Sequence, residues 1–77
     1  MITAAAILLD GVVYSLPKPA RHADIIKSIG YKVRYEIQGF IANGVFVDRI
    51  EGAKIAIESN QIDKLKWPPN LYSEDLW

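Results

Sequence analysis

A mainly apolar run covers Thr3–Leu9, stops at Asp10-Gly11 and resumes at Val12–Tyr14. Asp-Gly between two apolar runs is typical of a two-residue hairpin turn, because both residues tolerate positive φ angles. The alanines at positions 4–6 favour a helix by intrinsic propensity, but the apolar residues that follow them and end at the turn favour a strand. The pattern therefore predicts an amino-terminal β-hairpin.

A second hairpin is predicted around Asn43-Gly44, which joins the apolar segments 39–42 and 45–47. Asn-Gly readily adopts a type I′ turn and is the strongest local signal in the chain. Ahead of it, Tyr31–Gln38 alternates apolar and polar side chains, the pattern of a strand with one solvated face. Its charged residues would guard an exposed edge against unwanted pairing, so we expect this strand at an edge of the sheet.

Between the hairpins, Ala20–Ile29 has the spacing of an amphipathic helix. Pro17 and Pro19 end the preceding strand, because proline donates no ladder hydrogen bond, and Gly30 supplies a left-handed end to the helix. Apolar positions recur at i, i+3, i+4 and i+7. This stripe consists of His22, Ile25, Ile26 and Ile29.

A second helix is predicted over Arg49–Ser59. Asp48 can accept hydrogen bonds from its free amide groups, and Glu51 can reach back to complete a capping box. The expected inward stripe is Ile50, Ala53, Ala56 and Ile57. Trp67-Pro68-Pro69 then ends regular structure, so we expect the last eight residues to form an extended strap.

Together these elements predict a single α+β domain over residues 1–77. We expect a small antiparallel sheet of four or five strands, two helices on one face of it, and the carboxyl-terminal strap. A chain of 77 residues with 51% hydrophobic content builds a thin core, which favours a homo-oligomer. The sequence has no cysteine, so it lacks disulfides and is compatible with a reducing cytoplasm.

Nine basic and nine acidic residues balance, and neither sign gathers into a run. This distribution disfavours nonspecific binding to DNA or to an anionic membrane. The apolar start, Ile2–Leu9, is far too short to span a bilayer and no basic region precedes it. We therefore expect a soluble protein whose partners include neither DNA nor a membrane.

The inventory of reactive side chains disfavours an enzyme, since there is one histidine, no cysteine and no Gly-x-Ser-x-Gly turn. His22 and Asp24 point to different faces of a helix, and His22 is expected mainly as a structural residue at the border of the core. Glu74 and Asp75, adjacent on an extended tail, make a poor acid–base pair. No zinc, calcium or phosphate-loop motif occurs, so we expect no metal and no cofactor.

Cations at two predicted helix starts point instead to an anionic ligand. Arg21 and His22 occupy the first turn of one helix and Arg49 opens the other, although the positive end of the helix dipole disfavours them there. A bound phosphate would make both placements favourable. In the alternative interpretation, Arg21 pairs with Asp24 and Arg49 pairs with a carboxylate of the tail, without a ligand.

Aromatic side chains would supply the stacking surface of a nucleotide site. Phe40 and Phe46 are expected mainly as packing anchors of the core. Trp67, Tyr72 and Trp77 are better candidates for a subunit interface or for the wall of a ligand site.

The most distinctive segment is the ending Ser-Glu-Asp-Leu-Trp at positions 73–77. The other segments that carry the resemblance described next are Val13-Tyr14-Ser15, Arg21–Ile26, Gly39-Phe40, Phe46–Arg49, Ala53, Ile55, Ala56, Gln61-Ile62 and Leu71-Tyr72. In these segments the chain resembles a set of small proteins of phages and prophages, over nearly its whole length. This set looks similar to the Thoeris anti-defence sponges, a family that sequesters cyclic ADP-ribose-type signals and cyclic oligonucleotides within a multimer.

The resemblance implies a non-catalytic homo-oligomer in the host cytoplasm, whose arginines and aromatic residues hold a cyclic nucleotide signal. The matching positions are Arg21, Phe40, Arg49 and Asp75. Two other functions stay open at this point. A phage inhibitor would dock on a host defence component through the Tyr31–Ile37 edge or the Trp77 tail. A structural phage accessory protein would bind no ligand.

Overall fold

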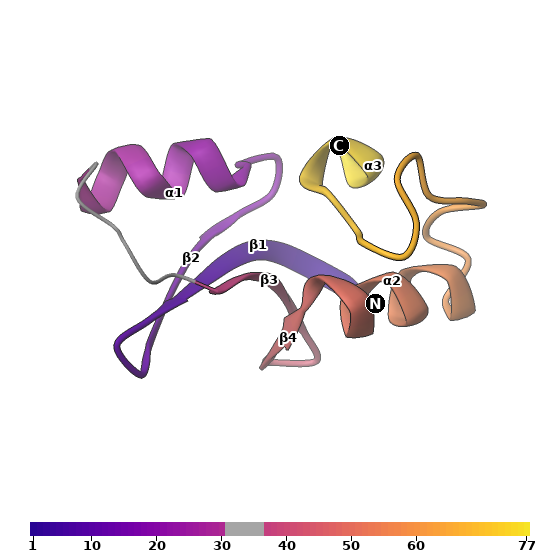
Figure 1. The fold of residues 1–77 in the computed structure, drawn as a ribbon, viewed down its shortest axis with the longest axis horizontal. Helices are drawn as coiled ribbons and strands as arrows, with labels where there is room; N and C mark the ends of the chain where they lie inside the picture. The colour runs from indigo at the N-terminus through magenta and orange to yellow at the C-terminus, as the bar shows by residue number, and fades with distance from the viewer. Residues whose placement is uncertain (31–36) are drawn as a thin grey trace.

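The computed structural model describes residues 1–30 and 37–77. Its elements are β1 (Ile2–Leu9), β2 (Val12–Pro17), α1 (His22–Ile29), β3 (Ile37–Ala42), β4 (Val45–Asp48), α2 (Arg49–Glu58) and α3 (Ser73–Leu76). The described strands form one sheet in the order β2-β1-β3-β4, and each neighbouring pair is antiparallel. Figure 1 shows α1 and α3 on the same side of this sheet. The predicted α+β class is confirmed.

Both predicted hairpins are present, and each turns through two residues with positive φ. Asp10 and Gly11 have φ angles of 50° and 77°, and Asn43 and Gly44 have φ angles of 52° and 78°. These are the angles of a type I′ turn, which matches the right-handed twist of the flanking strands. The turn residues therefore fix the register of β1 on β2 and of β3 on β4.

The strand predicted over Tyr31–Gln38 falls mostly outside the described residues, since only Ile37 and Gln38 belong to β3. β3 as a whole lies between β1 and β4, and the edges of the sheet are β2 and β4. Ile37 and Gln38, however, pair only with β1, because the pairing of β3 with β4 begins at Gly39. The described end of the predicted strand therefore has a strand partner on one side, and the rest of the prediction lies outside the described residues.

Phe40 lies at the centre of the core on the inner face of the sheet, which is the face that the helices cover. It is fully buried, and its neighbours across the sheet are Ala5 of β1 and Val47 of β4. A Cβ on Gly52 of α2 would lie 3.1 Å from Cδ2 of Phe40, so this glycine lets the helix approach the sheet closely. The buried cluster is Ile2, Ala5, Ile7, Ile25, Phe40, Ala42, Ala53, Ala56 and Leu71.

α1 follows the prediction closely. It begins at His22, both His22 and Ile25 are buried, and the Asp24 carboxylate accepts a hydrogen bond from the backbone N–H of Arg21 at 2.8 Å. Gly30 ends the helix with a φ of 98°. The predicted stripe of this helix is confirmed, because Ile26 and Ile29 also pack against the core.

α2 is present as predicted, but it is rotated about its axis. The Asp48 carboxylate accepts a hydrogen bond from the backbone N–H of Glu51 at 2.8 Å, as expected of an N-cap. Ile50 and Ile57 were expected to face inward, yet they are 48% and 41% exposed. The helix instead turns its small residues to the sheet, which places both isoleucines roughly 100° away from the contact line. Those small residues are Gly52, Ala53 and Ala56.

The carboxyl-terminal segment is not extended to its end, contrary to the prediction. Residues 59–72 form no helix or strand, and Leu71 enters the core, where its backbone N–H donates to the Arg49 carbonyl at 3.1 Å. The last residues coil into α3, a helix that the sequence did not predict. Among the helices described, none has the length and apolarity that crossing a membrane requires.

Candidate functional site

Arg49 is the first residue of α2, and its guanidinium group is held by the strap and by the sheet. Nη1 donates to the Leu71 carbonyl at 2.7 Å, Nη2 donates to Oε1 of Gln38, and the group lies 4.3 Å from the ring centroid of Tyr72. Burial lowers the pKa of Arg49, whereas Tyr72 and Glu74 raise it. Arginine nevertheless stays cationic at neutral pH, so this charge is fixed.

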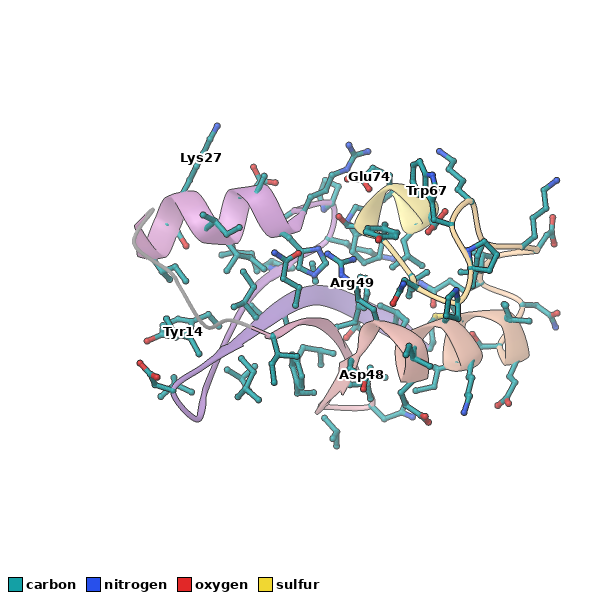
Figure 2. The ribbon with its side chains drawn as sticks, viewed as in Figure 1. Tyr14, Lys27, Asp48, Arg49, Trp67 and Glu74 are labelled. Atoms are coloured by element: carbon teal, nitrogen blue, oxygen red, sulfur yellow. The ribbon has the colours of Figure 1, made fainter. Side chains whose placement is uncertain are left out.

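An open cavity of about 500 Å³ lies beside this guanidinium group. It is lined by Gln38, Asp48, Arg49, Ile50 and Asn70. A guanidinium group has five N–H donors, and its bonds to described residues use two of them. Figure 2 places Arg49 between Asp48 and Glu74. The cavity therefore offers a cation with free donors, two amide side chains, a carboxylate and one apolar side chain.

Arg21 lies away from this cavity and fastens the carboxyl-terminal segment. Its Nε and Nη2 donate to the main-chain oxygen of Trp77, at 2.9 and 2.5 Å. The Trp77 indole in turn donates to the Ala20 carbonyl at 2.9 Å. The Asp24 carboxylate bonds the backbone of Arg21, so the expected side-chain pair between these two residues is replaced by the contact with Trp77.

His22 is a core residue in this structure. Its Nε2 lies 2.7 Å from the Gly39 carbonyl, and its ring meets the Phe40 ring edge-on at a centroid distance of 5.1 Å. Burial is the largest cause that lowers its pKa below the usual 6.5, and the charge of Arg49 acts in the same direction. The Gly39 carbonyl and Glu74 raise the pKa and offset part of this shift. These contacts fit the role in core packing that the sequence favoured for His22 and Phe40, and neither residue lines the cavity.

Asp75 also has a local role. One oxygen of its carboxylate accepts from the backbone N–H of Tyr72 at 3.0 Å and the other accepts from that of Lys66 at 3.3 Å. These bonds cap the start of α3 and join it to the preceding strap. The expected pairing of a tail carboxylate with Arg49 is not formed among the described residues, where Arg49 bonds a carbonyl and an amide instead.

The three aromatic residues expected at an interface have different exposures. Trp67 is 55% exposed and meets Tyr72 edge-on at a centroid distance of 5.4 Å. Tyr72 and Trp77 are half-buried, and Trp77 packs against the core. Only Trp67 among the three presents a large free surface in this structure.

Sequence reasoning singled out Arg49 but missed two polar residues that line the cavity beside it, Gln38 and Asn70. Gln38 carried a signal, because it stands two residues before Phe40 on the same face of β3, where an apolar residue is expected. Asn70 gave no such signal, since it follows the prolines in an irregular segment.

No cluster of histidine, acidic or cysteine residues suited to a metal ion occurs in residues 1–30 and 37–77. No curated protein and no solved structure matches this chain. The family model described as "Phage T4 y16D protein" matches residues 1–77, which confirms the resemblance to small phage proteins and shows that the chain belongs to this family.

Proposed function

We propose that this phage protein binds a nucleotide-type ligand in the Arg49 cavity without altering it chemically. In this way it would withdraw a cyclic nucleotide immune signal in the host cytoplasm. The observation that carries the proposal is the half-buried guanidinium group of Arg49, which lines a cavity and keeps donors free after making its structural contacts. Partial burial strengthens an ion–phosphate contact, because water screens the two charges less.

The other lining residues suit the rest of a nucleotide. The Asp48 carboxylate can accept hydrogen bonds from a sugar hydroxyl or a base amine, and the Gln38 and Asn70 amides can both donate and accept. Ile50 offers an apolar contact to a base. A volume of about 500 Å³ lies within the range of small-molecule sites. Inorganic phosphate alone would place an anion opposite the Asp48 carboxylate and would offer that carboxylate no hydrogen-bond donor beyond the one it receives from Glu51.

The choice of a cyclic ADP-ribose-type signal or a cyclic oligonucleotide comes from the resemblance to the anti-defence sponges. The cavity itself supports the wider class, an anionic ligand that also carries hydrogen-bond donors. A non-catalytic role accords with the cavity's lining, because Asp48 already caps α2 and the remaining groups are amides, a guanidinium and an isoleucine.

Calorimetric titration with cyclic ADP-ribose isomers and cyclic di- and trinucleotides tests this proposal. We expect saturable binding of one of them, with the ligand recovered unchanged after denaturation. Ile50→Glu is the variant of choice, since Ile50 is exposed and its replacement leaves the Arg49 contacts in place. A carboxylate about 8 Å from a bound phosphate costs about 2 kcal/mol, or roughly thirtyfold in affinity.

Ile57→Glu is the matched control. Ile57 lies on the same helix, is similarly exposed and does not line the cavity, so this variant should bind as the natural chain does. Flat titrations across the whole panel from a folded protein would overturn the proposal. Equal ligand affinity of the Ile50→Glu and Ile57→Glu variants would show that the ligand does not bind in this cavity.

A structural accessory role is the second candidate, and one observation favours it. Arg21 and Arg49 both bond main-chain oxygens of the carboxyl-terminal segment, so both guanidinium groups hold the fold together. The inhibitor that docks through its tail is less well supported, because the Trp77 indole and main-chain oxygen are both bonded within the chain. Flat titrations, together with a defect in phage assembly when this protein is deleted, would favour the accessory role.

A further inference from the structure

The side-chain amide of Gln38 has a single orientation beside Arg49. Nη2 of Arg49 donates to Oε1 of Gln38. Because a guanidinium group carries donors and no acceptor, the oxygen of the amide must face it and the amino group cannot. The Nε2 amino group of Gln38 is therefore the end turned away from Nη2, and it has no acceptor in residues 1–30 and 37–77. What Gln38 offers beside Arg49 is a pair of N–H donors.

Both side chains are held in place by the fold itself. Gln38 stands on β3, where it pairs with Ile7 of β1. Arg49 and Leu71 bond each other twice, since Nη1 of Arg49 donates to the Leu71 carbonyl at 2.7 Å and the Leu71 N–H donates to the Arg49 carbonyl at 3.1 Å. Gln38 and Arg49 are half-buried and both line the cavity. Their free N–H groups form a donor edge that is ordered in advance, which lowers the entropic cost of binding.

Asp48 gives another part of the cavity the opposite character. One oxygen of its carboxylate accepts from the backbone N–H of Glu51 at 2.8 Å, and the residue also lines the cavity. A carboxylate accepts hydrogen bonds and repels other anions. An anionic group is therefore favoured at the donor edge and disfavoured beside Asp48, so the cavity is polarised and sets the direction in which a ligand lies.

We propose that Gln38 is a ligand-binding residue, and that its Nε2 amino group and the free N–H groups of Arg49 hold one phosphate group of the ligand between them. Each side chain donates to a different non-bridging oxygen. A phosphodiester offers acceptors only and carries a negative charge, which matches the donor edge and the guanidinium cation. This inference rests on the proposed function and deepens it, because it names the part of the nucleotide that Arg49 takes.

One part of a nucleobase has the same acceptor pattern. The O6 and N7 atoms of guanine are adjacent acceptors, and arginine commonly donates to both. These atoms carry no charge, so a half-buried cation favours the phosphate over them. Adenine presents an amine donor beside N7, which would face the donors of the protein. Ligands whose only base is adenine therefore distinguish a phosphate contact from a guanine contact.

Two substitutions of Gln38 separate its donor from its other properties. Gln38→Glu keeps an oxygen that holds Arg49, but it replaces the amino group with a second oxygen and adds a charge. Gln38→Met keeps a neutral, unbranched side chain of similar length and removes both the oxygen and the amino group. The first variant therefore retains the contact with Arg49, and the second adds no charge. The missing donor is the change that the two variants share.

Calorimetric titration of cyclic ADP-ribose and cyclic di-AMP into the natural chain and both variants tests the proposal, with circular dichroism to verify folding. A hydrogen bond to a charged group is worth about tenfold to a hundredfold in affinity, so Gln38→Met should bind at least about tenfold more weakly and Gln38→Glu more weakly still. An affinity within about threefold of the natural chain in either variant overturns the role of Gln38 and leaves the proposed function standing. A natural chain that binds cyclic di-GMP but neither adenine ligand takes the guanine edge and overturns the phosphate contact. A natural chain that binds none of the three overturns both proposals.

Nuclear magnetic resonance of the natural chain supplies a test that depends on no variant. The chain has two glutamines, Gln38 and Gln61. Nε2 of Gln61 already donates to the Ile2 carbonyl at 2.9 Å, so this residue is the internal control. Saturation with cyclic ADP-ribose or cyclic di-AMP, whichever binds, should shift the side-chain NH2 signals of Gln38 and leave those of Gln61 in place. Binding that leaves the Gln38 signals unmoved overturns the proposal.

Discussion

Protonation of His22 is predicted to destabilise the fold, and the contacts of this residue set the sign of the effect. The ring is 6% exposed, it packs against Phe40, and its Nε2 donates to the Gly39 carbonyl. Burial is the largest cause that lowers its pKa, and the Arg49 charge acts in the same direction. The folded state therefore prefers the neutral ring.

The magnitude follows from proton linkage. In the unfolded chain His22 titrates near 6.5, whereas in the folded chain its pKa is lower. The stabilisation is complete above pH 6.5 and is lost as the pH falls toward the folded pKa, because the unfolded state then binds the proton first. The loss is at most about 1.4 kcal/mol per pH unit, or at most about 2 kcal/mol between pH 6.5 and pH 5. Glu74 and the Gly39 carbonyl raise the pKa and make the loss smaller.

Urea unfolding, followed by tryptophan fluorescence at pH values from 8 to 5, measures this effect. His22→Gln is the control, since glutamine keeps an N–H donor for the Gly39 carbonyl but does not titrate. The free energy of unfolding of the natural chain should fall more steeply on acidification than that of the variant. Parallel profiles for the two proteins would refute the reasoning, because the acid sensitivity would then belong to other groups.

Two further substitutions test the packing. Gly52→Val should lower the free energy of unfolding by about 1–3 kcal/mol, because its side chain would press on Phe40. Lys54→Val is the control, since it places the same β-branched residue at an exposed position of the same helix without the clash, and urea unfolding compares the two variants. Trp77→Phe should cost about 1 kcal/mol by removing the indole hydrogen bond to the Ala20 carbonyl, and a two-state thermal melt that shows no loss would contradict this.

The parts of the fold that were predictable from sequence are those that short segments determine. Asp10-Gly11 and Asn43-Gly44 fix their turns through their own backbone preferences, and Asp48 caps α2 through a contact three residues away. The rotation of α2 was not predictable in this way. Ile50 belongs to the more apolar stripe of the helix, but the bulk of Phe40 across the interface favours contact with smaller residues.

α3 was missed for a similar reason. A helix of one turn has little intrinsic stability, because nucleation fixes several dihedral angles for few hydrogen bonds. It forms here since Leu71 is buried ahead of it, Asp75 caps it, and Trp77 is bonded to Ala20 after it. The Asp75 cap is local, but the burial of Leu71 and the bond between Trp77 and Ala20 depend on residues far away in the sequence, which the local pattern of the tail does not contain.

Arg49 was predicted for its charge at a helix start, and the structure gives it a second role in holding the strap. The two roles are compatible, because bonds to Leu71 and Gln38 leave donors on the same guanidinium group. They also determine how the site must be tested. Replacing Arg49 would release the strap and the ligand together, so lost binding would not identify the cause. Ile50→Glu changes the cavity wall alone, and only an effect confined to that variant assigns ligand binding to the cavity.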